Sequence, residues 1–163
     1  MARDARAREI FSFHLATLPL WRVPAALFRQ VSSPENPGLR HSESFFTMNL
    51  GLPVLACRRY NLTTLALFAW WQDEASLDQF LARPANMAFA RGWHVRLRPY
   101  RRWGAVAKLQ DATIHSDLAA PSGPVVAVTL ARLRLTETLR FARWGHPVET
   151  QVRDHAGVRI AQA

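Results

Sequence analysis

Apolar and polar residues alternate in several short segments, which predicts a protein built around β-strands. The pattern is clearest over residues 11–16, where two phenylalanines and a leucine are separated by serine and histidine. A strand of this period has one apolar face and one more polar face. Residues 39–48 and 93–97 are predicted to form further strands. Residues 62–70 are continuously apolar, so we expect that strand in the interior of the sheet.

Between these strands lie segments whose apolar residues recur at helical spacing. Residues 21–31 are compatible with a helix that has Pro24 in its first turn, the position where proline is tolerated. Asp73 is a good N-cap for a second, amphipathic helix that ends near Pro84. The order β-α-β-β-α-β is that of the ferredoxin-like split βαβ unit, an α+β fold with an antiparallel sheet and both helices on one face. We expect the helices to cover the face that carries Phe11 and Phe13, which leaves the face of His14 open.

A weak internal similarity indicates a repeat. Residues 14–20 resemble residues 129–135, and residues 38–40 resemble residues 157–159 in the same order. The second copy would begin with a strand over residues 126–130, followed by a helix over residues 136–143, and a homodimeric partner or a longer natural chain would complete it. The predicted organisation is a complete unit over 10–108, a linker over 109–124 and an incomplete second unit over 125–163.

Composition narrows the range of partners and compartments. The 163 residues carry 21 basic and 12 acidic side chains, for a net charge of +9, and a surface this basic attracts anions. The single cysteine, Cys57, excludes an intramolecular disulfide and predicts a reducing compartment. Because no apolar run is long enough for a membrane span and no secretory signal is evident, we expect a cytoplasmic protein, with peripheral membrane contact as a further expectation.

Five segments carry a resemblance to a known family. They are Trp21–Ala26, Pro37–Arg40, Trp70–Phe80, Leu97–Gly104 and Arg143–Glu149. Together they resemble the spheroidene monooxygenase family, which implies a dimeric α/β-barrel form of the ferredoxin-like fold. The resemblance also implies a monooxygenase that uses molecular oxygen, with haem as the expected cofactor, on a small apolar substrate such as a carotenoid or another isoprenoid. Because the chain departs from the family over residues 41–51, a catalytically silent relative that binds a ligand or a partner is the alternative.

Histidines are the natural candidates for catalysis and for haem ligation, because histidine is the commonest axial ligand. His14 on the first strand and His94 on the fourth are both expected on the open face, where either could ligate haem or orient the substrate. We expect them to flank a cavity from some distance, without forming a metal clamp. The other histidines are expected in loops or at strand ends: His41, His115, His146 and His155.

Arginines and aromatic residues cluster around the fourth strand. Arg96, Arg98 and Arg102 could hold haem propionates through forked hydrogen bonds. The expected walls of an apolar substrate pocket are Phe68, Trp70, Trp93 and Trp103. The same cluster could bind RNA phosphates while its aromatic rings stack on bases. Nucleic-acid binding is nevertheless disfavoured, since the central strand lacks the aromatic and glycine pattern of sheet-surface RNA readers.

Overall fold

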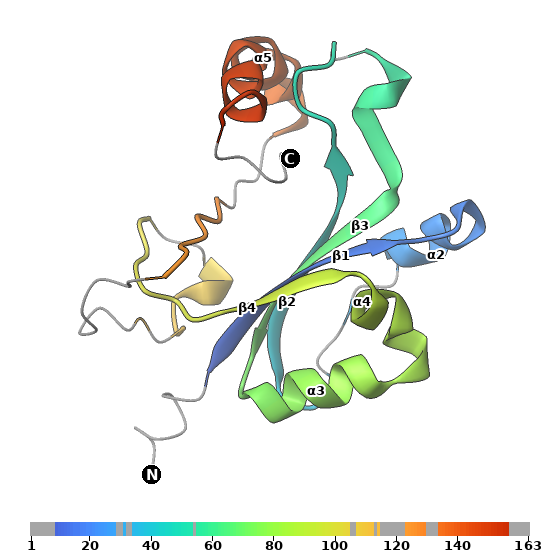
Figure 1. Ribbon diagram of the computed structural model, residues 1–163, viewed down its shortest axis with the longest axis vertical. Helices are drawn as coiled ribbons and strands as arrows, with labels where there is room; N and C mark the ends of the chain where they lie inside the picture. The colour runs from blue at the N-terminus through green and yellow to red at the C-terminus, as the bar shows by residue number, and fades with distance from the viewer. Residues whose placement is uncertain are drawn as a thin grey trace.

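One antiparallel sheet lies at the centre of the protein (Figure 1). Its strands are β1 (Ile10–Thr17), β2 (Leu39–Met48), β3 (Tyr60–Trp71) and β4 (Trp93–Leu97). The order across the sheet is β2-β3-β1-β4, and every neighbouring pair is antiparallel. The structure is a computed structural model that describes residues 9–28, 31, 34–53, 55–104, 107–112, 114, 123–129 and 134–156. The predicted α+β class with an antiparallel sheet is confirmed.

Short helices connect the strands. The α-helices are α2 (Val23–Phe28), α3 (Glu74–Ala82), α4 (Met87–Arg91) and α5 (Thr138–Arg153). The 3-10 turns are η1 (Leu20–Arg22), η2 (Cys57–Arg59), η3 (Pro84–Asn86), η4 (Ala107–Leu109) and η5 (Leu135–Glu137). Helix α3 begins as predicted, because the carboxylate of Asp73 accepts a hydrogen bond from the backbone N–H of Ser76 at 2.8 Å.

Helices α3 and α4 cover one face of the sheet, which we call the helix face. Leu77 and Phe80 of α3 and Phe89 of α4 pack onto the central strands. The strand residues beneath them are Ile10, Ala16, Leu65, Leu67, Ala69 and Trp71. This cluster is the main hydrophobic core of the described residues. The opposite side of the sheet is called the open face below.

The prediction of which face the helices cover is wrong. Because neighbouring residues of a strand alternate in direction, Ser12 and His14 lie on the helix face and the phenylalanines of β1 on the open face. Both polar residues are 0% exposed. The hydroxyl of Ser12 accepts a hydrogen bond from the indole Nε1–H of Trp71 at 2.8 Å. Ser12 and His14 leave room for the large rings of Trp71 and Phe80, so the more polar side of β1 packs in the core.

The C-terminal part differs from the predicted second unit. Of the strand expected over residues 126–130, residues 126–129 are described and form no regular structure. A helix does follow, but it extends beyond the predicted end at residue 143, to Arg153, and contains Pro147. The division into two repeated units therefore stays a prediction. His115, residue 130 and residues 157–159 lie outside the described residues, as does the side chain of His146.

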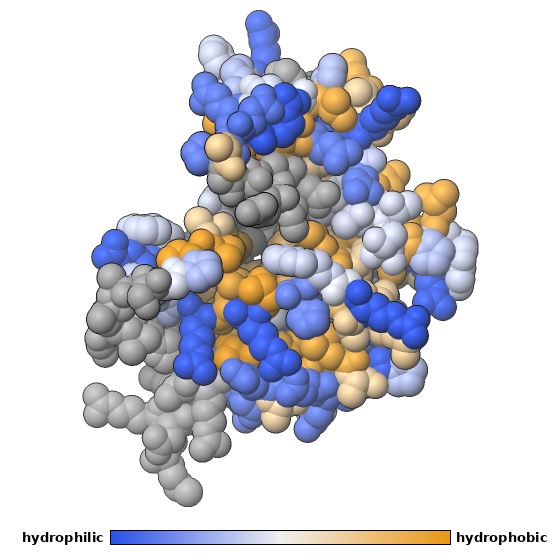
Figure 2. Space-filling view, in the orientation of Figure 1, coloured by the Kyte–Doolittle hydropathy of each residue, from blue (hydrophilic) through white to orange (hydrophobic). Residues whose placement is uncertain are grey.

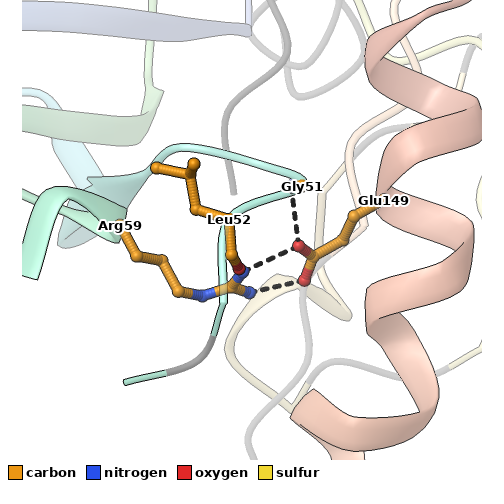
Figure 3. Close-up of polar contacts among 4 residues, drawn as sticks. All are labelled: Gly51, Leu52, Arg59 and Glu149. Carbon is orange, nitrogen blue, oxygen red and sulfur yellow. Dashed lines mark hydrogen bonds and ion pairs between the residues drawn. The ribbon is translucent and has the colours of Figure 1, made fainter. Parts of the chain in front are cut away.

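Helix α5 is attached to the β2–β3 hairpin by one carboxylate (Figure 3). The guanidinium of Arg59 donates to both carboxylate oxygens of Glu149, at 2.5 and 2.8 Å, and to the carbonyl oxygen of Leu52 at 2.7 Å. The backbone N–H of Gly51 donates to the same carboxylate at 3.0 Å. Arg59 is only 3% exposed, so this ion pair is shielded from water and holds α5 against the hairpin.

No helix in the described residues is long and apolar enough to cross a membrane.

Candidate functional site

The open face of the sheet carries a floor of aromatic rings. Phe11 of β1 stacks on Phe68 of β3, with ring centroids 5.4 Å apart, and on Trp70, with centroids 6.0 Å apart and planes 9° from parallel. The strand register explains the contact, since Phe11 is the cross-strand partner of Trp70. Phe68 and Trp70, two of the expected pocket residues, therefore lie together on this face.

The rings of Phe13, Phe45 and Trp93 continue this aromatic floor and are more exposed to solvent than Phe11, Phe68 and Trp70. Phe13 lies 6.4 Å from Phe45 of β2 and 6.2 Å from Trp93 of β4, measured between ring centroids. Trp93 is half-exposed and meets Phe13 edge to face. A partly exposed aromatic surface of this kind suits a flat or elongated apolar ligand, because the rings supply a large contact area with fixed geometry.

A short segment after β4 covers one end of the aromatic floor. Leu109 and Ala112 are buried against the rings of Phe11, Phe68 and Trp70. The guanidinium of Arg102 donates to the backbone carbonyl oxygens of this segment, at 2.6 Å for Leu109 and 3.2 Å for Gln110. Arg102, expected to bind a cofactor, therefore holds the covering segment in place.

Two polar residues that the sequence interpretation missed lie at the other side of this floor. His41 and Glu43 of β2 are the cross-strand partners of Trp70 and Phe68 and share their face. Nε2 of His41 lies 3.1 Å from Oε1 of Glu43, and their side chains are 11% and 30% exposed. His41 is the third residue of β2, which agrees with its predicted position in a loop or at a strand end. Alternation within the predicted strand 39–48 would have placed His41, Glu43 and Phe45 on one face.

His14 and His94 lie elsewhere than predicted. They are direct cross-strand partners on β1 and β4, on the helix face, with their ring centroids 5.4 Å apart. His14 is fully buried between Phe80 and Phe89. His94, at the sheet edge, is exposed. The expectation that the two histidines flank a cavity on the open face from some distance is therefore wrong.

Burial also changes the chemistry of His14. Desolvation, followed by the charge of His94, lowers the pKa of His14 to about 4. The backbone of Phe89 opposes this lowering only in part, and neither ring nitrogen has a well-formed hydrogen bond within the described part of the chain. At neutral pH His14 is therefore a neutral core residue, and it cannot touch a ligand on the open face.

Arg96 and Arg98 pair with the acidic side of α3. Arg96 lies 2.5 Å from Asp78 and 3.6 Å from Glu74, and Arg98 lies 3.8 Å from Glu74, measured between guanidinium nitrogen and carboxylate oxygen. Arg96 follows the alternation of His94 and points to the helix face, away from the aromatic floor. Two of the arginines that were expected to bind haem propionates are therefore already paired with carboxylates of α3.

Trp103 lies outside the aromatic floor. It is 80% exposed, and its partner is the guanidinium of Arg101, 5.5 Å from the ring centroid. This contact is a surface cation–π interaction. Of the four expected pocket residues, the structure therefore brings together Phe68 and Trp70, places Trp93 beside them through Phe13, and leaves Trp103 apart.

The positions of His94, Arg96 and the apolar walls show whether the residues predicted to hold haem lie together. Within the described residues no group of three or more His, Cys, Asp and Glu side chains could hold a metal ion. For haem, which needs only one axial ligand, the candidate His94 and its neighbour Arg96 lie on the helix face, while the apolar walls lie on the open face. The residues predicted to hold haem therefore do not fit a single haem site.

Comparison with known proteins places the chain in no family. No protein-family model matches it, and no curated protein does either. Among solved structures, it is similar to the crystal structure of a conserved protein from Methanosarcina mazei Go1, with 13% sequence identity and a TM-score of 0.36. The match covers 59% of this chain and 97% of that one.

Proposed function

We propose that the protein binds an elongated apolar ligand, of the isoprenoid class that the family resemblance implies, across the open face of the sheet. The observation that carries the proposal is the set of partly exposed rings of Phe45, Phe13 and Trp93, which pack beside the buried cluster of Phe11 and Trp70. The rings at the Trp93 side are partly exposed, so a ligand can reach them. The strand order β2-β3-β1-β4 supports the ferredoxin-like interpretation of the sheet, in which both helices pack on the other face.

The pair of His41 and Glu43 supplies the polar part of this site. Nε2 of His41 is paired with the carboxylate of Glu43, so Nδ1 is the ring nitrogen that can form a hydrogen bond with a hydroxyl group of a ligand. We therefore propose a ligand with a polar end group near His41 and an apolar chain over Phe45, Phe13 and Trp93.

Ligand binding is better supported than oxidation of the ligand. Activation of molecular oxygen requires a redox cofactor or a substrate that itself reacts with oxygen. The residues predicted for haem do not fit it, whereas the aromatic floor needs no cofactor to bind a ligand. The monooxygenase activity implied by the resemblance stays a proposal, and the binding relative without that activity is the function that the geometry favours.

Titration with all-trans-retinol tests the binding proposal, because this isoprenoid alcohol becomes more fluorescent in an apolar site. We expect saturable binding that Trp93→Ala weakens by about tenfold, the loss that follows from removing a large aromatic contact. Trp103→Ala is the matched control, since it removes an exposed tryptophan outside the floor. An equal loss in both variants, or no saturable binding, would contradict the proposal.

A second titration tests the polar end of the site. His41→Leu should weaken the binding of retinol. The inhibition constant of squalene, measured by displacement of retinol, should stay unchanged, because this isoprenoid hydrocarbon has no group for His41 to recognise. A parallel loss for both ligands would show that His41 only shapes the sheet.

A further inference from the structure

Helix α5 carries an exposed row of apolar side chains, which we call the α5 stripe. Its members are Phe141, Trp144, Val148 and Val152. Steps of three and four residues place them on one side of the helix. Their exposed fractions are 59% for Phe141, 74% for Trp144, 55% for Val148 and 46% for Val152. Glu149, which anchors the helix to the hairpin, lies on a neighbouring side, so the anchor leaves the stripe uncovered.

More apolar side chains are exposed at the same end of the protein. They are Leu20, Trp21, Leu55, Tyr60 and Leu62, of which Leu55 is 89% exposed. The end of β1 pairs with the beginning of β3, and the N–H of Leu18 donates to the carbonyl of Thr63, so η1 lies beside the first residues of β3. The ion pair of Arg59 and Glu149 brings α5 to the same hairpin. Figure 1 shows α5 next to this end of the sheet.

Basic residues accompany these apolar side chains. Helix α5 contains Arg140, Arg143 and Arg153, of which Arg140 is paired with Glu137 and Arg153 with Asp154, while Arg59 neutralises the charge of Glu149. Near η1, the guanidinium of Arg22 lies 4.7 Å from the ring centroid of Trp21. Figure 2 shows strongly hydrophilic and hydrophobic side chains next to one another over α5, at the top of the view. The chain as a whole carries a net charge of +9.

We propose that α5 and the neighbouring hairpin bind the surface of an anionic lipid bilayer. A helix with aromatic and aliphatic residues on one side and arginines beside them is typical of helices that lie in the membrane interface. Tryptophan is favoured at that depth, and anionic lipids attract the arginines. Helix α5 would lie parallel to the membrane with the α5 stripe among the acyl chains and Leu55 inserted beside it.

The charge distribution favours a membrane over a second copy of the chain. A symmetric contact through the α5 stripe would bring the arginines of two α5 helices together, and two chains of net charge +9 would repel each other. The apolar side chains are also spread over a helix, a loop and η1, a surface that a deformable bilayer can cover more easily than a rigid partner.

Sedimentation with vesicles tests this proposal. We expect binding to vesicles of phosphatidylcholine and phosphatidylglycerol in equal amounts, and much weaker binding to phosphatidylcholine alone. Trp144→Ala should weaken the binding by about tenfold, and Phe141→Ala combined with it should weaken binding further. Trp103→Ala is the matched control, because this tryptophan is similarly exposed but belongs to the segment after β4 and not to α5. Absence of binding to the anionic vesicles, or equal losses for Trp144→Ala and Trp103→Ala, would overturn the proposal.

A labelled protein provides a readout that does not depend on losing a side chain. A polarity-sensitive dye on Val148→Cys, in a Cys57→Ser background, should shift to the blue with anionic vesicles, while the same dye on Trp103→Cys should not. An unshifted dye at residue 148 would overturn the proposal. So would a dimer in vesicle-free solution that Trp144→Ala dissociates, since the α5 stripe would then be a contact between copies.

Discussion

His14 and His94 face each other as cross-strand partners on β1 and β4, and only His94 is exposed to water. The groups that lower the proton affinity of the buried ring are His94 and Arg96, in addition to burial itself. This relationship makes His14 a source of pH-dependent stability.

Stability should fall as the pH drops through the range between 6.5 and about 4. Unfolded His14 has a pKa near its ordinary value of 6.5, while the folded pKa is about 4, so the unfolded state binds the additional proton in this range. The contribution is complete above pH 6.5, and about 3 kcal/mol is lost by pH 4. Urea unfolding of the wild type and of His14→Leu over this range measures it. The variant should lack most of the dependence; an unchanged slope would show that other groups cause it.

The ion pair of Arg59 and Glu149 should determine whether α5 stays attached. Glu149→Gln leaves the buried guanidinium of Arg59 without its counter-charge, which costs about 3 kcal/mol in a shielded pair. We expect amide hydrogen exchange to accelerate throughout α5 while the sheet keeps its protection. Glu137→Gln is the control, because it removes an exposed ion pair with Arg140 that contributes well under about 1 kcal/mol. Equal protection of α5 in both variants would mean that other contacts hold the helix.

Gly92 should not tolerate a side chain. A Cβ atom at this position would lie 2.2 Å from the backbone carbonyl oxygen of Leu15, and a backbone atom in the middle of β1 cannot move aside cheaply. We expect Gly92→Ala to reduce the free energy of unfolding by about 2 kcal/mol or more.

The reverse is expected at Gly145 inside α5, where a Cβ would meet nothing within 4 Å. Gly145→Ala should stabilise the helix by up to about 1 kcal/mol. Thermal unfolding of the two variants checks both signs. A stable Gly92→Ala variant would show that α4 and β4 can separate from β1 without cost.

The strands could be predicted because their evidence is local. Alternation over residues 11–16 and 93–97 identifies β1 and β4, and Asp73 as an N-cap predicts the start of α3. Alternation cannot tell which face the helices cover, however. Local alternation places Ser12 on the more polar face of its strand, but its partner in the core, the indole of Trp71, is 59 residues away in the sequence.

The site was harder to predict for the same reason. Phe68 and Trp70 could be predicted as pocket residues because they are aromatic residues on a strand that is apolar throughout. His41 was missed because its role depends on Glu43 and on register with β3, neither of which a single histidine reveals. The attachment of α5 depends on Arg59 and Glu149, which are 90 residues apart.

Haem titration distinguishes the two interpretations of the site. Because Arg96 is paired with Asp78 and Glu74, and His94 lies across the sheet from the aromatic floor, removing either should have no effect on haem spectra. We expect any Soret band that appears on adding haemin to be the same in wild type, His94→Ala and Arg96→Ala. Retinol binding measured on the same samples shows that each variant is folded. A Soret band that disappears in His94→Ala alone, with retinol binding intact, would identify His94 as the axial ligand and support the monooxygenase interpretation, because a coordinated histidine is the feature that only haem binding requires.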